Sequence, residues 1–228
     1  MIIGGFQKMT MLDYPGKIAC TIFTYGCNFK CPFCHNARLV LEEATPFTED
    51  EILSYLNKRK GVLDGVCISG GEPMLQSDLF EFIKKVKDIG LLVKLDTNGY
   101  FPDKLKYAID NGLVDYVAMD IKNCREKYAL TVGNDKIDIS NIEKSVELLK
   151  EGKVDYEFRT TVTKELHTTE DFAKIGEWIF GAKRYYIQNF VDSGNLIENT
   201  SSPLDTQGLK ALLEAVLPYV GSASLRGV

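Results

Sequence analysis

Three cysteines crowded into one short stretch, residues 26–34 (GCNFKCPFC), are the strongest candidates for chemistry in this chain. Cys27, Cys31 and Cys34 follow one another at intervals of four and three residues. Pro32 lies between them and argues against a helix, because a proline in a helix interior costs about 3 kcal/mol. An irregular loop with three thiolates can bind a metal group and leave one metal position open for a ligand.

Three other interpretations of this spacing stay open. The cysteines could form an apolar stripe on a helix, complete a zinc site with His35, or belong to a ferredoxin-like electron carrier. Zinc sites commonly use paired C-x2-C units, and a carrier cluster needs a fourth cysteine. Cys20 and Cys67 lie in predicted buried strands and Cys124 stands alone in a loop, so none of them is a convincing fourth ligand.

The elements that must position this loop alternate regularly along the chain. Short β-branched apolar runs are followed by amphipathic stretches, which predicts six strand–helix units, a parallel sheet and right-handed crossovers. The predicted strands begin at Ile18, Gly65, Leu91, Asp115, Val154 and Arg184. The predicted helix starts are the Thr48–Glu51 capping box, Ser77, Pro102 and the pair Ser140–Glu143.

Polar and glycine-rich segments come at the ends of these strands. After the cysteine loop they are SGGEP (69–73), DTNG (96–99), DIK (120–122), RTT (159–161, within the fifth strand) and QN (188–189). In a β/α barrel the carboxyl ends of all strands open onto one face, so these segments are expected to meet there. Because six units are too few for a closed barrel, we predict an α/β fold of the incomplete (β/α)6, TIM-like type. An open doubly wound sheet is the generic alternative.

The C-x3-C-x2-C loop after the first strand, with the aromatic Phe33 before its last cysteine, resembles that of the radical S-adenosylmethionine (SAM) superfamily. SGGEP, DTNG and DIK resemble segments of its glycyl-radical-enzyme activases. The resemblance implies that Cys27, Cys31 and Cys34 bind three irons of a [4Fe–4S] cluster and that SAM chelates the fourth. It also implies that one-electron reduction cleaves SAM, and that the resulting 5′-deoxyadenosyl radical abstracts a glycine Cα hydrogen from a partner enzyme.

The same resemblance assigns roles to the polar segments. Gly70, Gly71 and Glu72 are expected to hold the methionyl amine of SAM. Arg159 is a candidate for the SAM carboxylate, or else a buried arginine paired only with Glu157 or Asp155. The other residues expected around SAM are Phe33, Asp96, Thr97, Asn98, Asp120, Lys122 and Gln188, with Asp120 and Lys122 counted as catalytic.

Two histidines and one strand end are less closely defined by the resemblance. Gln188 and Asn189 stand where some activases carry a histidine on the last strand. His35 is expected to influence the cluster environment without binding iron. His167 is expected in a solvent-exposed loop.

The opening segment GGFQKMTMLDYPGK, together with GCNFKCPFCHN, is similar to the activating proteins of anaerobic ribonucleoside-triphosphate reductase. That reductase is therefore the expected protein substrate, with a flavodoxin or ferredoxin as electron donor. The alternatives are activation of another glycyl radical enzyme, and a small-molecule radical SAM reaction of the carboxydeazaguanine-forming type. An iron–sulfur electron carrier or a zinc-binding module would be an alternative outside the enzymes.

The whole chain of 228 residues reads as one radical SAM domain. We predict a turn-rich lead-in (1–17), a partial-barrel core (18–217) and a tail (218–228) whose end is disordered. A formal net charge of -5 and a pI near 5.2 give no general attraction to nucleic acid or acidic membranes. The sequence shows neither a signal peptide nor an apolar run of the roughly 20 residues that span a bilayer, so a cytoplasmic protein is expected.

Overall fold

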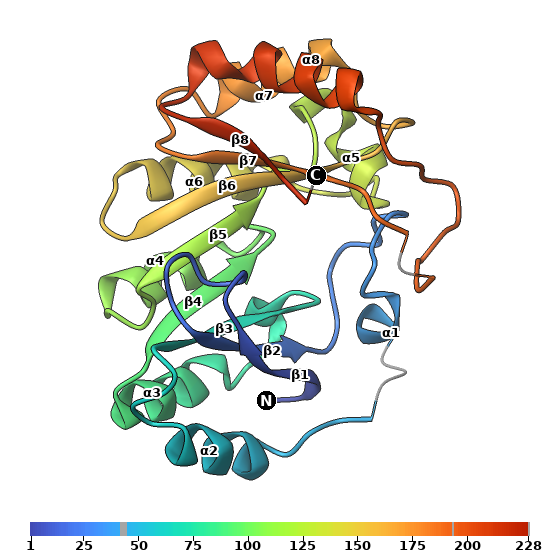
Figure 1. Cartoon of the computed structure of the whole chain (residues 1–228). Coiled ribbons are helices and arrows are strands. Elements are labelled where there is room, and N and C mark those ends of the chain that lie inside the picture. The colour runs from blue at the N-terminus through green and yellow to red at the C-terminus, as the bar shows by residue number, and fades with distance from the viewer. Residues whose placement is uncertain (42–44, 193, 228) are drawn as a thin grey trace.

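A single curved sheet carries the whole fold (Figure 1). The computed structural model describes residues 1–41, 45–192 and 194–227, and its strands pair in chain order from β1 to β8. β1 runs antiparallel to β2, and every later pair is parallel. The strands are β1 Ile3–Thr10, β2 Ala19–Thr24, β3 Gly65–Gly70, β4 Leu92–Thr97, β5 Tyr116–Asp120, β6 Asp155–Val162, β7 Tyr185–Asn189 and β8 Ala223–Arg226.

The longer helices cover the outer face of the sheet, whereas α1 and α5 lie at the carboxyl ends of the strands (Figure 1). The helices are α1 Ala37–Val40, α2 Glu49–Lys58, α3 Leu79–Ile89, α4 Pro102–Asp110, α5 Tyr128–Val132, α6 Ile139–Lys150, α7 Thr169–Trp178 and α8 Thr206–Val216. Short 3-10 turns occupy Pro73–Leu75, Arg125–Lys127 and Leu217–Tyr219. The predicted α/β fold with a partial, TIM-like barrel is confirmed, and the six predicted strands correspond to β2–β7.

Alternation along β4 shows how the sheet separates the core from the site. Val93 and Leu95 are fully buried in the apolar core, together with Ile83 of α3. Lys94 and Asp96 point to the opposite, concave face, because successive side chains of a strand alternate between faces. The inner face is therefore free to carry polar side chains without disturbing the core.

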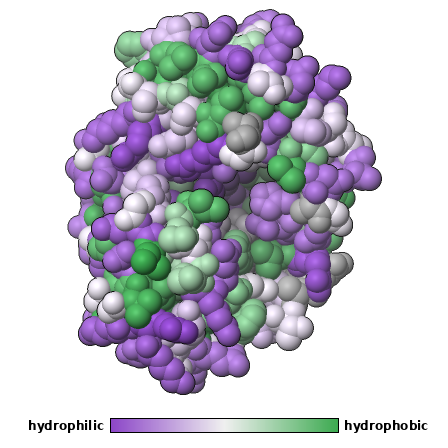
Figure 2. All heavy atoms as spheres, in the orientation of Figure 1, coloured by the Kyte–Doolittle hydropathy of each residue, from purple (hydrophilic) through white to green (hydrophobic). Residues whose placement is uncertain are grey.

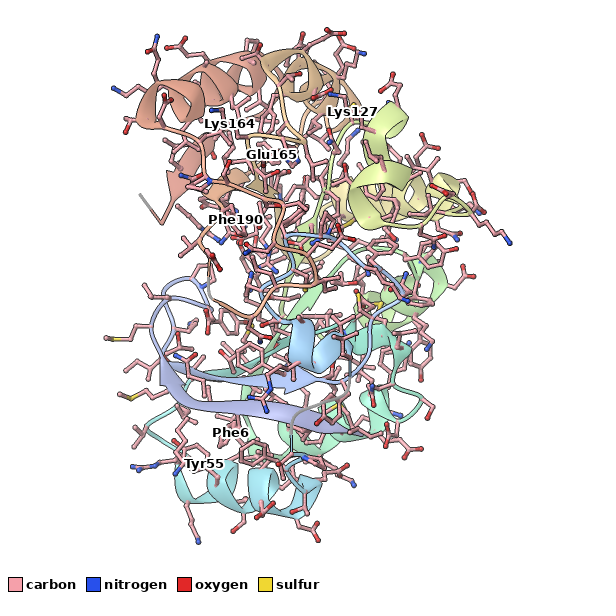
Figure 3. The ribbon with its side chains drawn as sticks, turned by 90° about the vertical axis from the view of Figure 1, so that its right-hand side faces the viewer. Phe6, Tyr55, Lys127, Lys164, Glu165 and Phe190 are labelled. Atoms are coloured by element: carbon pink, nitrogen blue, oxygen red, sulfur yellow. The ribbon has the colours of Figure 1, made fainter. Side chains whose placement is uncertain are left out.

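Both ends of the chain differ from the prediction. The segment expected as a turn-rich lead-in contains β1, which pairs with β2 and is held to α2 by a hydrogen bond from Tyr55 Oη to the Lys8 carbonyl (2.8 Å). Phe6 packs edge-on against Tyr55, as Figure 3 shows, with ring centroids 5.1 Å apart. The segment expected as a tail with a disordered end contains β8, which pairs with β7 along its whole length, up to Arg226. Both strands were missed because they lie at the edges of the sheet, where only part of each side chain is buried.

Two predicted helix starts are confirmed and two are wrong. Thr48 forms the predicted capping box at α2, and Pro102 is the first residue of α4. α3 follows Asp78 and not Ser77. α6 begins at Ile139 after Asp138, whose side chain accepts a hydrogen bond from the Ser140 backbone. In both wrong cases a neighbouring aspartate occupies the cap position that the sequence analysis gave to serine.

The surface in the view of Figure 2 is mostly hydrophilic, and its apolar side chains form separate patches. Within the described residues, no helix is long and apolar enough to cross a membrane.

Candidate functional site

A cavity of about 250 Å³ opens at the carboxyl ends of the parallel strands. It is where the segments that follow β2, β3, β4 and β5 meet side chains of β6 and β7. Every residue predicted for the site lines this cavity except Glu72. The predicted residues that line it are Cys27, Cys31, Phe33, Cys34, Gly70, Gly71, Asp96, Thr97, Asn98, Asp120, Lys122, Arg159 and Gln188.

The cysteine loop is fixed by backbone hydrogen bonds on several sides. The Lys30 amide donates to the Val132 carbonyl at the end of α5 (2.9 Å), and the Cys34 amide donates to the Cys31 carbonyl (3.0 Å). Cys31 is buried, whereas Cys27 and Cys34 are half-buried at the cavity wall. The three thiols thus lie on a loop held in place by the surrounding fold.

Burial raises the pKa of all three cysteine thiols. It raises the pKa of Cys27 to about 12 and that of Cys31 to about 11, although the Lys122 ammonium opposes the shift at both. A bound cationic metal group would deprotonate them, since metal-ligating cysteines are thiolates. The buried Nδ2 of Asn28, which has no hydrogen-bond partner among the described residues, offers a further donor beside Cys27. Three thiols on one cavity wall with an available amide donor fit a [4Fe–4S] cluster.

Two glycines let the turn after β3 pack directly onto the start of the cysteine loop. A Cβ at Gly71 would lie 1.9 Å from the Gly26 carbonyl oxygen, which no side chain can tolerate. Gly70 has φ +116°, and a Cβ there would lie 2.3 Å from the Thr24 amide nitrogen. The Glu72 amide then donates to the Gly26 carbonyl (2.8 Å). The glycines therefore bring the backbone of this turn to the cavity beside the cysteines.

Glu72 is fully buried and does not reach the cavity wall. Its carboxylate accepts hydrogen bonds from the Met74 amide (3.1 Å), the Thr97 hydroxyl (2.9 Å) and the Asn98 amide (2.7 Å). Burial outweighs these bonds and raises the pKa of Glu72 to about 7. The structure thus shows Glu72 as the residue that fixes the turn after β4, where Thr97 and Asn98 line the cavity.

Arg159 lies between two carboxylates on the inner face of the sheet. Its Nε donates to Asp120, and its Nη1 lies 3.1 Å from Asp96 Oδ2. Neither Glu157 nor Asp155 pairs with it, so the alternative that the sequence analysis gave for this arginine is wrong. Lys122 Nζ donates to the other oxygen of Asp120 (2.7 Å).

These partners keep the whole group charged. Burial alone would raise the pKa of Asp120, but the positive charges of Arg159 and Lys122 hold it well below its usual range. Burial would likewise lower the pKa of Lys122, and the Asp120 carboxylate raises it instead. The cavity therefore presents fixed charges of both signs at neutral pH.

His167 is buried, which contradicts the predicted exposure. Its Nδ1 accepts a hydrogen bond from the Thr163 amide (3.1 Å), which assigns the proton to Nε2, 2.9 Å from the Lys122 carbonyl oxygen. Its ring lies edge-on to Phe33 at a centroid distance of 6.4 Å. His167 thus supports two residues of the cavity wall from behind.

Two cavity residues lie in the predicted segments without a role assigned to them from the sequence. Ser69 lines the cavity and donates from its hydroxyl to Asp96 Oδ2 (3.1 Å). Thr161 lies two residues beyond Arg159 on the same face of β6. Strand alternation from Asp96 and Arg159 was the signal that could have found the inner-face residues. Of the three other cysteines, Cys124 is buried, does not line the cavity and contacts Asp171.

Residues 194–205, which lead into α8, contact the cysteine loop and the loop after β6. The Glu198 amide donates to the Pro32 carbonyl of the cysteine loop (3.0 Å). Further along, the Ser202 amide donates to Glu165 (3.0 Å), and the Lys164 amide donates to the Ser202 carbonyl (3.0 Å). Figure 3 shows Lys164 and Glu165 in the upper half of the view, with Phe190 below them.

A second cavity of about 300 Å³ adjoins the first and shares His35, Thr161 and Gln188 with it. Its remaining wall comes from residues 189–191 after β7 and from Arg226 and Gly227 at the end of β8. His35 therefore lies between the cysteine loop and this second space.

Comparisons with known proteins identify the family of this chain. The family model of the Radical SAM superfamily matches residues 21–179. A protein of Methanocaldococcus jannaschii named as a glycyl-radical enzyme activating enzyme is 38% identical over 193 residues, which cover 83% of this chain and 80% of the relative. The pyruvate formate-lyase-activating enzyme of Clostridium pasteurianum is 31% identical over 156 residues, which cover 64% of this chain and 63% of that enzyme.

Solved structures show the same fold at lower sequence identity. Streptococcus suis SuiB bound to its precursor peptide SuiA matches 91% of this chain with a TM-score of 0.70 at 17% identity. The chain spans 48% of the length of SuiB. The structure titled anSMEcpe with bound AdoMet matches 86% of this chain with a TM-score of 0.63 at 21% identity.

Radical SAM enzymes are oxidoreductases that use a [4Fe–4S] cluster and SAM, and the three cysteines predicted to bind the cluster line the cavity described above. The matched family region includes the three cysteines, the turn after β3 and the inner face of β4–β6. On this match and the similarity to activating enzymes, the chain belongs to the glycyl-radical-enzyme activases of the radical SAM superfamily.

Proposed function

We propose that this protein installs a glycyl radical on anaerobic ribonucleoside-triphosphate reductase, and that residues 1–228 act as one catalytic domain. The observation that carries the proposal is the single cavity in which Cys27, Cys31 and Cys34 meet the polar segments of the other strands. The similarity of the opening segment to reductase activating proteins supports this partner over other glycyl radical enzymes. A flavodoxin or ferredoxin would donate the electron, and the protein would act in the cytoplasm.

The chain's own residues would hold both cofactors. When bound, a [4Fe–4S] cluster and SAM supply the one-electron cleavage of SAM and the hydrogen abstraction that follows. The three cysteines would bind the cluster, and the backbone of Gly70 and Gly71 would meet the methionyl amine. Arg159 would bind the SAM carboxylate, because its Nη2 makes no hydrogen bond within the described residues.

A protein substrate also needs a path to the cavity. The second cavity would admit the glycine-bearing segment of the partner, since it adjoins the first and shares His35, Thr161 and Gln188 with it. Thr161 and Gln188 are uncharged side chains, and burial and the Lys122 ammonium lower the pKa of His35. Within the described residues these three side chains make no hydrogen bonds, so they are available to the backbone amides of a peptide.

The test is to mix the reconstituted protein with the reductase of the same organism, SAM and a reductant under anaerobic conditions. Electron paramagnetic resonance should then show a glycyl radical on the reductase, and the signal should be absent when the reductase glycine is replaced by alanine. Pyruvate formate-lyase serves as the competing partner. A radical formed on pyruvate formate-lyase and not on the reductase would contradict the proposed partner while supporting activase chemistry.

A further inference from the structure

Lys94 is a buried lysine that the proposed function has not used. It lies on the inner face of β4, paired in register with Cys67 of β3 and Tyr116 of β5. Its side chain is 2% exposed. The ammonium donates to Asp96 Oδ1, and the Cys67 sulfur lies 3.8 Å away. An ammonium group held out of water needs such an ionised partner, because an unpaired buried charge is costly.

The Lys94–Asp96 pair begins a chain of alternating charges that ends beside the cysteines. Asp96 Oδ1 accepts a hydrogen bond from the Lys94 ammonium. Asp96 Oδ2 lies 3.1 Å from Arg159 Nη1 and accepts a hydrogen bond of 3.1 Å from the Ser69 hydroxyl. Arg159 donates a hydrogen bond to Asp120, and Lys122 also donates to Asp120. We call this row of five residues the charge ladder: Lys94, Asp96, Arg159, Asp120 and Lys122.

Lys94 sets the net charge of the charge ladder. Two lysines and one arginine face two aspartates, which leaves one positive charge, and without Lys94 the ladder would be neutral. Lys94 is also the one member of the ladder that does not line the cavity. Its effect on a ligand must therefore pass through Asp96 to Arg159.

We propose that Lys94 is a positioning residue for SAM, one that orients Asp96 and Arg159 and makes the cavity selective for the carboxylate of the methionyl group. Lys94 donates a hydrogen bond to Asp96 Oδ1, so Asp96 forms its ion pair with Arg159 through its other oxygen, Oδ2. Asp120 fixes the same guanidinium from the opposite side through Nε. The third nitrogen, Nη2, for which the described residues provide neither a hydrogen bond nor an ion pair, is then held in one orientation. This inference rests on the proposed function in taking SAM as the ligand and Arg159 as the residue that binds its carboxylate.

The experiment compares two ligands on the cluster-loaded protein under anaerobic conditions. Equilibrium dialysis would measure the dissociation constants of SAM and of decarboxylated SAM, which differ only in the carboxylate. Lys94→Met should raise the dissociation constant of SAM by about ten-fold or more, the scale of one charge-assisted hydrogen bond. The constant for decarboxylated SAM should change less than about two-fold, because its binding lacks the group that Arg159 meets.

Lys106→Met is the matched control, since Lys106 pairs with Asp110 on the exposed side of α4. It should leave both constants unchanged. The double variant Lys94→Met/Asp96→Asn also removes both charges of the buried pair, which keeps the inference testable if Lys94→Met alone does not fold. It should bind SAM no more weakly than Asp96→Asn, because Lys94 acts through Asp96.

Equal losses of both ligands in Lys94→Met would overturn the inference and assign Lys94 a general structural role. An unchanged affinity for SAM would overturn it as well. A cluster-loaded wild-type protein that binds neither ligand would contradict the proposed function itself, and with it any role of Lys94 toward SAM.

Discussion

Glu72 contacts residues of the site although it is fully buried and does not line the cavity. Its carboxylate receives three hydrogen bonds, and two of them come from Thr97 and Asn98 at the cavity wall. Asn98 in turn donates to Asn28 (2.8 Å), which joins the turn after β4 to the cysteine loop. One buried carboxylate therefore sets the relative position of two segments that would hold SAM and the cluster.

Glu72→Gln should weaken SAM binding while iron content stays near that of the wild type. All three partners are donors, so the amide group of glutamine would place N–H groups against N–H or O–H groups. The wild-type free energy of unfolding should also fall relative to the variant as pH rises. A carboxyl whose folded pKa is raised from 4.5 to about 7 stabilises the fold fully below pH 4.5 and loses that contribution by about pH 7.

The size of this pH effect is roughly 3 kcal/mol, from the shift in pKa. Urea unfolding of both proteins at pH 5 and pH 8 measures it. If the free energy of unfolding of the wild type, relative to the variant, increased with pH, ionising Glu72 would not destabilise the folded protein. Unchanged SAM affinity in the variant would remove Glu72 from the site altogether.

The sequence was enough to predict the residues with distinctive chemistry that line the cavity. It was not enough to predict the residues that hold them in place. The spacing of the cysteines and the polar strand ends pointed to residues that the fold brings to one cavity. Lys94 and Ser69 were not assigned roles, because their importance comes from contacts across neighbouring strands. His167 was assigned to solvent because its burial depends on Phe33 and Phe172, which are distant in sequence or lie on another element.

At the scale of elements, the contact between the turn after β3 and the cysteine loop depends on the absence of side chains. Gly71→Ala should force these two segments apart, because its Cβ would overlap the Gly26 carbonyl oxygen. We expect a loss of about 1–3 kcal/mol in the free energy of unfolding and a reduced iron content after reconstitution. Urea unfolding and iron analysis measure the two effects.

Gly208→Ala is the matched control for Gly71→Ala. Gly208 lies in the first turn of α8, where alanine favours the helix and the nearest atoms belong to the side chains of Asp205 and Leu204. It should retain its iron and its stability. A Gly71→Ala protein that takes up iron like the control would show that this close contact is not needed for the site.

The last strand is tied to β6 by an ion pair between the half-buried Arg226 and the fully buried Glu157. Arg226 donates to both oxygens of Glu157 (2.6 and 2.8 Å) and stacks on Tyr186, with its Cζ 3.4 Å from the ring centroid. Glu157 is fully buried, and its other hydrogen bond comes from the Tyr116 hydroxyl (2.8 Å). The sequence could not predict this pair, because Glu157 and Arg226 lie on strands that are separated in the sheet by β7.

Arg226→Met should lower the free energy of unfolding by about 3 kcal/mol, since it leaves the Glu157 carboxylate without its cation. The double variant Arg226→Met/Glu157→Gln should recover part of that loss. Lys174→Met, which breaks an exposed pair with Glu170, should cost less than about 1 kcal/mol. Urea unfolding compares the three proteins, and equal stability of Arg226→Met and Lys174→Met would contradict the role given to this pair.

At the scale of the whole molecule, the residues that stabilise the open barrel lie on the other face of the sheet from the residues of the candidate site. The apolar core lies between the sheet and the outer helices, whereas the inner face carries the charge ladder and the two connected cavities. β8 ends beside the second cavity, so the sheet remains open at the side where a protein segment would enter. This arrangement suits a reaction whose substrate is part of another protein.

The central claim is that Cys27, Cys31 and Cys34 support reductive cleavage of SAM. The most direct measurement is the formation of 5′-deoxyadenosine by the anaerobically reconstituted protein after SAM and dithionite are added. Wild-type protein and Cys20→Ala, which alters a buried cysteine away from the cavity, should both form the product, and Cys31→Ala should form none. Formation of 5′-deoxyadenosine by Cys31→Ala at the wild-type rate would contradict the account.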